Sequence, residues 1–401
     1  MGAELSASAV PIIPAATSYF GRAWQIWIDT QGSSGTNGKR YIVSSVVSQS
    51  EEPLRVQFAI DTAMNLSFWT ADVTIYNLRQ PASSIGPSLA AALTADMRFL
   101  AGDTVTICAG YNVPNVGFSA DANTIFSGRV FQPVLSRVGV VDWTMKFRCA
   151  CGLVENTLNF VNMPLTGAPT YYETLRAIAE TKTEDGGAGF GPVDIDDASK
   201  TILQAQSLSR GQAFFSRPYE LFRDMMQQCT LFGWVDTAPP QTEQIPYKPS
   251  LPGETPSTVQ PKPTLHVRSF RMPPSEPDIS YGPPNLDPKF TRGLKNFKPT
   301  VLDVPEQTEK GVIFRVLMDS SVRIGMTVQI VQGTVIAPFQ FTPFGGSYPP
   351  VPSRNGLFVV YGVRHIGDTR GQGDDWYTEI TGVNYDWFTG FVAAMTAGAK
   401  K

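Results

Sequence analysis

The sequence is poor in the side chains on which most active sites depend. It contains 2 histidines and 4 cysteines among 401 residues, and charged residues make up only 17% of it. The two histidines, His266 and His365, lie far apart in the chain, and neither has the spacing of a zinc motif. The nucleophile elbow, the Walker loop, the dinucleotide fingerprint and the CxxC pair are missing too. We therefore expect no catalytic residue, no cofactor and no metal.

Clustered positive charge and long apolar runs are also missing. The net charge is −3, so the basic surface that binds nucleic-acid phosphates is not expected. No stretch is long and apolar enough to span a membrane, and residues 1–20 lack the basic start and apolar run of a signal peptide. These absences argue against sequence-specific DNA binding and against stable membrane insertion.

The cysteines do not suggest a disulfide framework. Cys149 and Cys151 lie two residues apart in a strand-like run, so their side chains point the same way and are poorly placed to bond with each other. Buried, reduced thiols are typical of proteins made in a cytoplasm. We therefore expect the chain to fold in a cytoplasm with its thiols reduced.

Strand patterns dominate residues 1–151. Between 143 and 151 one face of the run is formed by Trp143, Met145, Phe147, Cys149 and Cys151, which is the alternation of a half-buried strand. Similar runs occur at 24–30, 41–47, 54–60, 71–78 and 103–111. One short helix is predicted at 84–97. Together these patterns predict an antiparallel β-barrel or sandwich, and we take residues 1–151 as a first antiparallel β-barrel domain.

The next residues change character. Thr170 and Glu173 form a capping box, which predicts a helix, and a second helix is predicted from Pro218 to about Phe232 with Gly233 as its stop. We interpret residues 152–236 as a small α+β domain. Repeated prolines in residues 237–300 predict a linker with a short strand segment.

The strand patterns return in the last third of the chain. They lie at 311–318, 326–331, 356–366 and 376–383, so residues 301–401 are predicted to form a second antiparallel β-barrel. Trp387, Phe391 and Met395 then recur at helical spacing, which predicts a C-terminal helix with one apolar edge. That edge packs either on its own barrel or on a neighbouring subunit.

The two β regions share landmarks in the same order. Residues 102–107, 125–128 and 142–147 of the first region are matched by 325–330, 359–362 and 375–380 of the second. Each match is weak alone, because short β-rich runs look alike. As a set they favour an internal duplication, although coincidence stays an alternative. Two similar barrels per chain would let three chains present six similar units, and a trimer could then match a hexameric ring.

Several of these runs resemble phage baseplate hub proteins. The stretch ADVTIYNL…GDTVTICAGY…TIFSGRV…VDWTMKFRCACG is similar to the first tube-like domain of that family, and GLFVVYGVRHIGDTRGQGDDWYTEITGVN is similar to its closing hairpin. The resemblance covers about half of the chain, while residues 153–310 match no motif of the family. The positions that carry it are Ile75, Tyr76, Asn77, Leu78, Gly110, Tyr111, Gly128, Trp143, Gly362 and Trp376.

The resemblance implies a structural subunit of a virion tail baseplate, assembled in the host cytoplasm. It implies a homotrimer of two tube-like barrels each, forming a pseudo-hexameric ring between the tail tube protein and the central spike protein. Other baseplate proteins would surround the ring. The tape-measure protein and DNA would pass through its lumen without sequence-specific binding. Trp387, Phe391 and Met395 are then a possible subunit interface.

Other functions stay open at this point. A tail-tip peptidoglycan hydrolase would use carboxylates as acid and base, for which Glu155, Glu173 and Glu180 qualify only by residue type. A carbohydrate-binding tail protein would use exposed aromatic residues, and the tryptophans in strand patterns are Trp24, Trp27, Trp69 and Trp143. A calcium site at Asp194, Asp196 and Asp197 lacks the glycine and glutamate of an EF-hand, and a His365–Asp368 pair is more typical of a turn.

Overall fold

The computed structural model describes twelve stretches of the chain. They are residues 21–30, 40–45, 54–66, 68–78, 99–112, 118–138, 142–236, 262–270, 276–308, 311–331, 357–371 and 375–384. The predicted helix at 84–97 and the predicted C-terminal helix with Trp387, Phe391 and Met395 lie outside the described residues. Residues 237–261 and 271–275 of the expected proline-rich linker lie outside them too.

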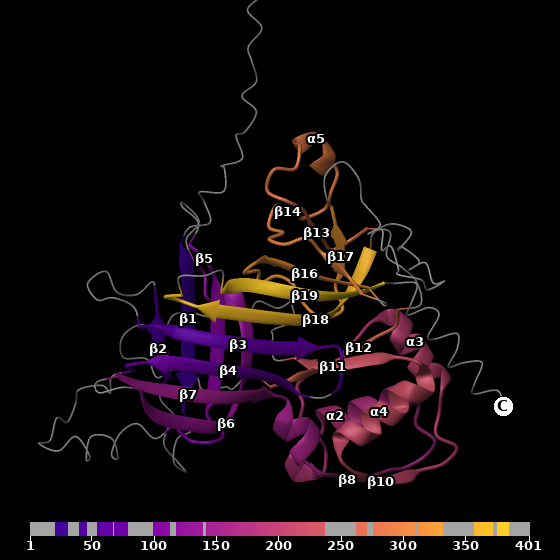
Figure 1. The fold of residues 1–401 in the computed structure, drawn as a ribbon. Helices are drawn as coiled ribbons and strands as arrows, with labels where there is room; N and C mark the ends of the chain where they lie inside the picture. The colour runs from indigo at the N-terminus through magenta and orange to yellow at the C-terminus, as the bar shows by residue number, and fades with distance from the viewer. Residues whose placement is uncertain are drawn as a thin grey trace, which may run out of the picture.

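One large mixed sheet forms the centre of the molecule (Figure 1). From one end to the other its strands run β14-β13-β17-β18-β3-β4-β7-β6-β5-β1-β2, with β19 and then β16 and β15 branching from β18. The N-terminal strands are β1 (Arg22–Asp29), β2 (Arg40–Ser44), β3 (Val56–Ala63), β4 (Trp69–Tyr76), β5 (Thr104–Tyr111), β6 (Thr124–Val138) and β7 (Asp142–Cys151). The C-terminal strands are β13 (Ile279–Tyr281), β14 (Phe297–Lys298), β15 (Glu306–Gln307), β16 (Gly311–Leu317), β17 (Thr327–Ile330), β18 (Leu357–Asp368) and β19 (Trp376–Asn384).

The prediction of two antiparallel barrels is wrong for the residues that the structure describes. Their strands do not close into a barrel, and β18 joins the two β regions by pairing with β3. The sheet is mixed, because β13 runs parallel to both β14 and β17. Alternation in sequence shows which side chains face a core, but closure depends on strand tilt and stagger, which alternation does not encode.

The two β regions nevertheless contain the same five-stranded unit. In the first, the hydrogen-bonded order is β3-β4-β7-β6-β5, and in the second it is β15-β16-β19-β18-β17. The strands also follow one another along the chain in the same order in both units. Each unit begins with a hairpin, β3–β4 or β15–β16, and continues with three strands, β5–β6–β7 or β17–β18–β19. The last of these strands, β7 or β19, pairs with the second strand of the hairpin. All of these pairs are antiparallel. We call these units the first half and the second half.

Backbone details place the two halves in register. Gly102 and Gly325 both have positive φ, 103° and 84°, which glycine adopts without steric cost. Gly102 donates to the carbonyl of Val130 at 2.7 Å, and Gly325 donates to the carbonyl of Val360 at 2.9 Å. A β-bulge then follows each valine, between Val130 and Gln132 in β6 and between Val360 and Gly362 in β18. Val130 therefore corresponds to Val360.

This register confirms two of the three sequence landmarks and corrects the third. Val130 pairs with Cys149, and Val360 pairs with Gly382, as the match of 142–147 with 375–380 requires. In the middle landmark, however, Gly362 corresponds to Gln132 rather than to Gly128. The error arose because short runs of β-branched residues before a glycine fit more than one alignment, whereas a bulge has one position.

A small α+β domain packs beside the sheet, at the lower right of Figure 1. Its helices are α2 (Tyr171–Glu180), α3 (Asp197–Ala205) and α4 (Pro218–Cys229), and a single helical turn occupies Val154–Leu158. Its strands are β8 (Val161–Leu165), β9 (Asp194–Ile195), β10 (Gln212–Ser216), β11 (Phe232–Asp236) and β12 (Thr264–Arg268). The predicted capping box at Thr170 and Glu173 is confirmed.

Two details of this region differ from the sequence interpretation. Helix α4 ends at Cys229 because Thr230 takes the left-handed conformation, so Gly233 is not the stop and lies in β11. Within the expected linker, β12 pairs with β11 and β9. Strands β13 and β14 belong to the C-terminal part of the large sheet, and α5 (Pro288–Thr291) lies between them in the chain.

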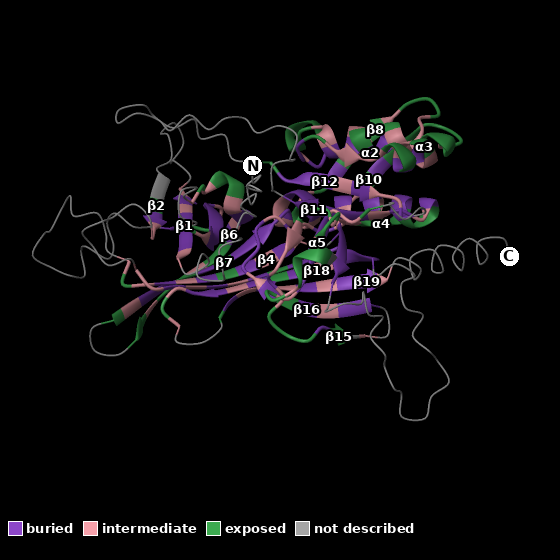
Figure 2. Ribbon diagram, turned by 90° about the horizontal axis from the view of Figure 1, so that it is seen from above, coloured by how far each residue is buried: buried purple, intermediate pink, exposed green. Residues whose placement is uncertain are grey.

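Burial follows the strand pattern (Figure 2). In β7, Met145, Phe147, Cys149 and Cys151 are buried, while Lys146 and Arg148 are exposed. All four cysteines are buried and none forms a disulfide, as expected. Trp24 and Trp69 lie in the core, and Trp27 and Trp143 are half-buried. Among the described helices, none is both long and apolar enough to cross a membrane.

Candidate functional site: the junction of the two halves

The two halves meet where β18 pairs antiparallel with β3. The register runs from Gly362 opposite Ala63 to Asp368 opposite Gln57, so only the part of β18 beyond its bulge takes part. The earlier residues of β18 pair with β17 on that same side. The bulge bends the strand and re-aims its edge, which lets one strand serve both halves. We call the β3–β18 contact and its surroundings the junction.

A charged cluster fixes the end of this contact. The guanidinium of Arg55 donates to both carboxylate oxygens of Asp368, at 3.2 and 2.7 Å, and the amide of Gln57 donates to the second oxygen at 2.8 Å. Burial raises the pKa of Asp368, but the hydrogen bonds from Arg55, Gln57 and the backbone of Arg370 outweigh this and lower it to about 2. The carboxylate is therefore charged at neutral pH.

Aromatic packing covers the same contact. The ring of Trp376 lies edge-on to Phe58 with 5.5 Å between centroids, and its indole N–H donates to the carbonyl of Gly110 at 3.3 Å. The guanidinium of Arg22 lies 5.9 Å from the centroid of the Trp376 ring. A Cβ at Gly367 would lie 2.2 Å from the Phe58 ring, so that position requires glycine. One tryptophan of the second half therefore contacts β3 and β5 of the first half and also Arg22 of β1.

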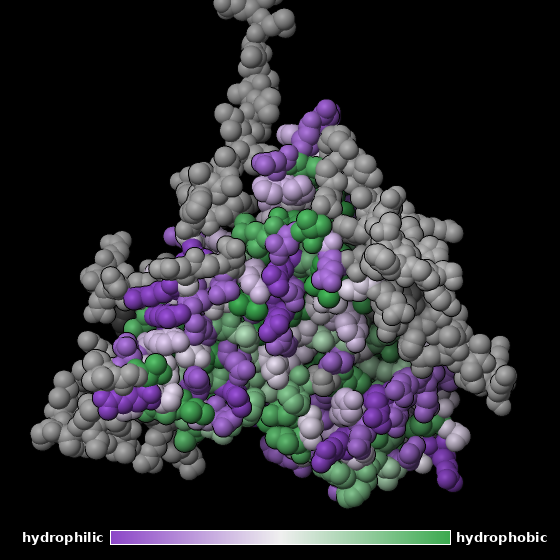
Figure 3. All heavy atoms as spheres, in the orientation of Figure 1, coloured by the Kyte–Doolittle hydropathy of each residue, from purple (hydrophilic) through white to green (hydrophobic). Residues whose placement is uncertain are grey.

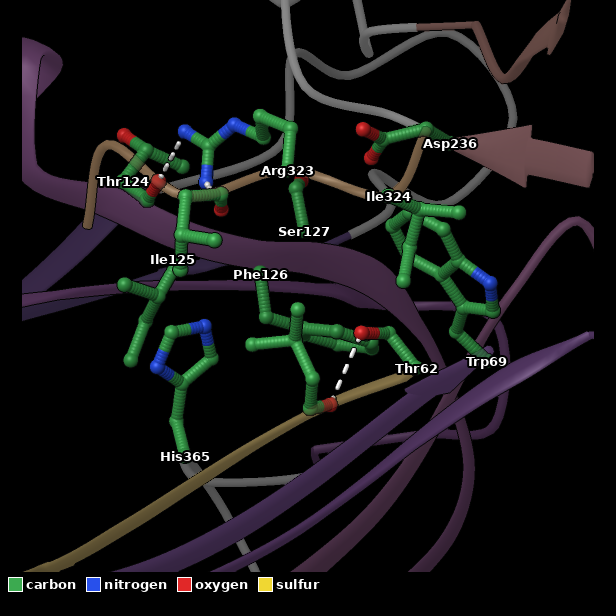
Figure 4. A pocket seen from close by; sticks show the side chains of 12 residues that line it. Thr62, Trp69, Thr124, Ile125, Phe126, Ser127, Asp236, Arg323, Ile324 and His365 are labelled. Atoms are coloured by element: carbon green, nitrogen blue, oxygen red, sulfur yellow. Dashed lines mark hydrogen bonds between the residues drawn. The ribbon is translucent and has the colours of Figure 1, made fainter. Parts of the chain in front are cut away.

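Polar contacts also cross between the halves. Ser320 donates to Asn123 at 2.9 Å, and Arg323 donates to the carbonyl of Thr124 at 2.8 Å. Figure 4 shows Arg323 and His365 on opposite sides of Ile125, around a cavity with a volume of about 10 Å³. That volume has room for about one water molecule. The cavity is too small for a substrate, and the contacts around it hold the two halves together.

His365 is a buried part of this junction. Its Nδ1 is 2.9 Å from the hydroxyl of Thr378, and burial together with the nearby Arg323 charge lowers its pKa to about 3. It is therefore neutral at pH 7. His365 and Asp368 both lie on β18 with different partners, so the turn suggested from the sequence is not formed.

The structure gives most of the family-motif residues structural contacts. Asn77 ends β4 with φ 53° and binds the start of β7, since its amide donates to Asp142 and its side-chain oxygen accepts from the Trp143 backbone. Ile75 is fully buried, and the hydroxyl of Tyr76 donates to Gln57 at 2.8 Å. The motif thus ties the hairpin of the first half to its meander, and Tyr76 reaches the junction.

The other motif positions are glycines and apolar or aromatic side chains. Gly128 faces the backbone of Ala150, which a Cβ would approach to 2.9 Å, and Gly110 faces Asn123 at 2.8 Å, so both need the absence of a side chain. Gly362 has ordinary space around it. Leu78 and Tyr111 pack against the core. Gly110 and Trp376, far apart in the chain, are in direct contact.

The carboxylates considered from the sequence have structural partners. Glu155 is buried and binds Arg129 at 2.9 Å, Glu173 caps α2, and Glu180 binds Arg176 at 2.8 Å. Glu155 is therefore a buried partner of Arg129 and not a solvated surface charge. Asp194 contacts His266 and Arg268, and Asp196 caps α3 by accepting from the Ser199 amide.

Sequence reasoning missed Arg55 and Phe58 as junction residues. Both lie in or next to a predicted strand, and nothing in a single sequence distinguishes an edge that pairs within the chain from one that faces solvent. The signal that existed was the repeat itself, because a duplicated unit must place some edge of one copy against the other.

Comparisons with known proteins give structural likenesses alone. No protein-family model matches the chain, and no curated protein sequence is significantly similar to it. Among solved structures, it is similar to a 43 kDa tail protein of prophage MuSo2 from Shewanella oneidensis, with a TM-score of 0.47, 9% identity, and 90% of this chain and 99% of that one covered.

Two further likenesses are of the same kind. A tail protein from Neisseria meningitidis gives a TM-score of 0.45 with 11% identity, covering 92% of this chain and 99% of that one. A component of the type VI secretion system from Escherichia coli gives 0.44 with 8% identity, covering 85% and 76%. The structures that this chain resembles are thus tail proteins and a secretion-system component.

Proposed function

We propose that this chain is a structural subunit of a phage tail baseplate hub. Three copies form a ring of six similar units that joins the tail tube protein to the central spike protein and surrounds the channel. The tape-measure protein and DNA pass through that channel without sequence-specific contacts, and other baseplate proteins lie around it.

One observation carries this proposal, namely the repeated five-stranded unit. A chain with two equivalent halves joined edge to edge presents two similar surfaces, so three chains can contact a sixfold partner on one side and a threefold partner on the other. The motif resemblance of both halves to hub proteins points the same way. The junction supports it as well, because its tight packing fixes the angle between the halves.

The test is the assembly state of the purified chain, alone and mixed with tube or spike protein. We expect light scattering to give a mass three times 43.7 kDa in at least one mixture, and electron-microscopy class averages to show a threefold ring. A monomer in every mixture would contradict the proposal. Dye release from labelled cell wall and binding to a glycan array test the hydrolase and carbohydrate alternatives.

A further inference from the structure

Exposed large apolar side chains gather at one edge of each half. In the first half, Phe131, Val134, Leu135 and Val138 are exposed along the end of β6, and Leu100 is exposed in the loop before β5. In the second half, Leu302 and Val304 are exposed beside β15. We call these surfaces the β6 edge and the β15 edge. Green side chains reach the surface over β6 and β7 in Figure 3. Exposed apolar groups of this kind mark protein contacts.

The repeat indicates what covers the β6 edge. In the second half, the part of β18 beyond the bulge has β19 on one side and β3 on the other. In the first half, the corresponding part of β6 has β7 on one side. Strand β5 pairs with β6 only as far as Arg129, and the described strands supply no neighbour beyond it. An exposed strand edge of this kind is a template for another strand.

Exposure at equivalent positions supports this comparison. Because Val130 corresponds to Val360, Leu135 corresponds to His365 and Val138 to Asp368. Leu135 is 47% exposed while His365 is 2% exposed, and Val138 is 48% exposed while Asp368 is 6% exposed. The positions that the junction buries in the second half are therefore apolar and uncovered in the first.

The same correspondence identifies the partner strand. Cys149 corresponds to Gly382, and their partners in the next strand are Ala71 and Val312. Ala71 pairs with Ile60 of β3, and Val312 pairs with Gln307 of β15. Strand β15 thus occupies in the second half the place that β3 occupies in the first, and Gln307 corresponds to Ile60.

We propose that the β6 edge of one copy pairs antiparallel with the β15 edge of a second copy, repeating the junction between chains. Ile60 lies opposite His365 and Ala59 opposite Ile366 within the chain. Between chains, the equivalent pairs are Leu135 opposite Gln307 and Ser136 opposite Glu306. The residues just before β15 shift register against β16, since Val301 bridges to Val316 while Glu306 pairs with Ile313. Leu302 and Val304 lie in this shifted segment and are 44% and 77% exposed, so this contact brings exposed apolar side chains of both edges together. This interface rests on the hub function, since it is the contact by which the ring would close.

Two prolines set the length of this contact. Pro133 in β6 and Pro305 beside Glu306 have no amide hydrogen, so neither can donate to a ladder between strands. The pairing is then short, and it is limited to a few residues around Ser136. A short ladder with apolar neighbours has one favoured register and does not extend into open-ended sheet growth. The two edges are different surfaces, so the contact is head-to-tail and leads to a ring or a filament.

Cysteine pairs placed across the proposed contact test it directly. Directly opposite residues in antiparallel strands have Cα atoms about 4.5–5.5 Å apart, which a disulfide can bridge. The native cysteines are all buried, so new surface thiols react separately. Full-length Ser136→Cys mixed with full-length Glu306→Cys should give, under mild oxidation, a species at twice the chain mass and none larger. A chain with both substitutions should give species at twice and three times the chain mass.

The matched control is Leu158→Cys, since Leu158 is exposed on the small domain. Mixed with Ser136→Cys, it should give at least about tenfold less product. Equal product from the two mixtures, or from Ser136→Cys alone, would overturn the head-to-tail register. The charge variant Leu135→Glu should weaken self-association about tenfold or more in light scattering, while Leu158→Glu should leave it unchanged.

These outcomes separate the interface from the hub function. Trimers that form without the expected disulfide, and that tolerate Leu135→Glu, would refute this interface and leave the hub proposal standing. Disulfide-linked chains that extend beyond three copies would support the interface and contradict the closed ring.

Discussion

Replacing Trp376 by alanine tests whether the junction holds the two halves together. The indole is buried, lies edge-on to Phe58 and donates to the Gly110 carbonyl. Removing a buried tryptophan side chain costs about 3–5 kcal/mol, because the transfer free energy is lost and a cavity remains. Of this, the aromatic pair accounts for about 0.5–1.5 kcal/mol and the hydrogen bond for a similar amount, about 0.5–1.5 kcal/mol.

The conservative variant Trp376→Phe separates these contributions. It keeps a ring against Phe58 and loses the hydrogen bond, so we expect a loss of about 1–2 kcal/mol. Urea unfolding of the full chain, followed by fluorescence and by circular dichroism, measures both variants. Trp143→Ala is the control, because Trp143 is half-buried outside the junction. A loss below about 1 kcal/mol for Trp376→Ala, or one no larger than that of the control, would refute the role of Trp376 in cohesion.

Two further predictions concern titration and thiols. The pKa of His365 falls from 6.5 to about 3 on folding, so between these pH values the unfolded chain binds a proton at His365 and the folded chain does not. The contribution of His365 to stability is therefore complete above pH 6.5 and declines as the pH falls toward 3. His365→Gln should flatten that part of a profile of melting temperature against pH. An unchanged profile would contradict this assignment. The thiols of Cys149 and Cys151 are buried, and burial raises the pKa of Cys149. A thiol reagent should therefore label them only after denaturant is added. Rapid labelling of the native chain would show that the opposite face of β7 points into the core.

Much of the fold could be predicted from local pattern. Alternation located β1, β3, β4, β5, β7, β16, β18 and β19 to within a few residues, because each has one face against a core. The capping box at Thr170 and Glu173 located α2, since a cap satisfies free amides through neighbours in sequence. Helix α3 was missed, because its cap at Asp196 was considered as a metal ligand.

The repeat was visible in the sequence, but its register was not. The glycine before β5 and β17 and the Asp-Trp start of β7 and β19 were matched correctly. Gly362 was aligned with Gly128 because both follow β-branched or aromatic residues, and only the bulges after Val130 and Val360 correct this. A bulge is a relation between two strands, so a one-dimensional pattern does not contain it.

The sequence by itself determined which residues face a core, where most strands lie, and that the two β regions contain similar runs in the same order. Those are consequences of side-chain period, turn chemistry and composition, all of which are local. The tertiary structure alone decided that β18 pairs with β3, that Arg55 holds Asp368, and that Trp376 reaches Gly110. Strand edges offer the same backbone donors and acceptors whatever their side chains, so the choice of edge partner depends on how the whole sheet bends and packs.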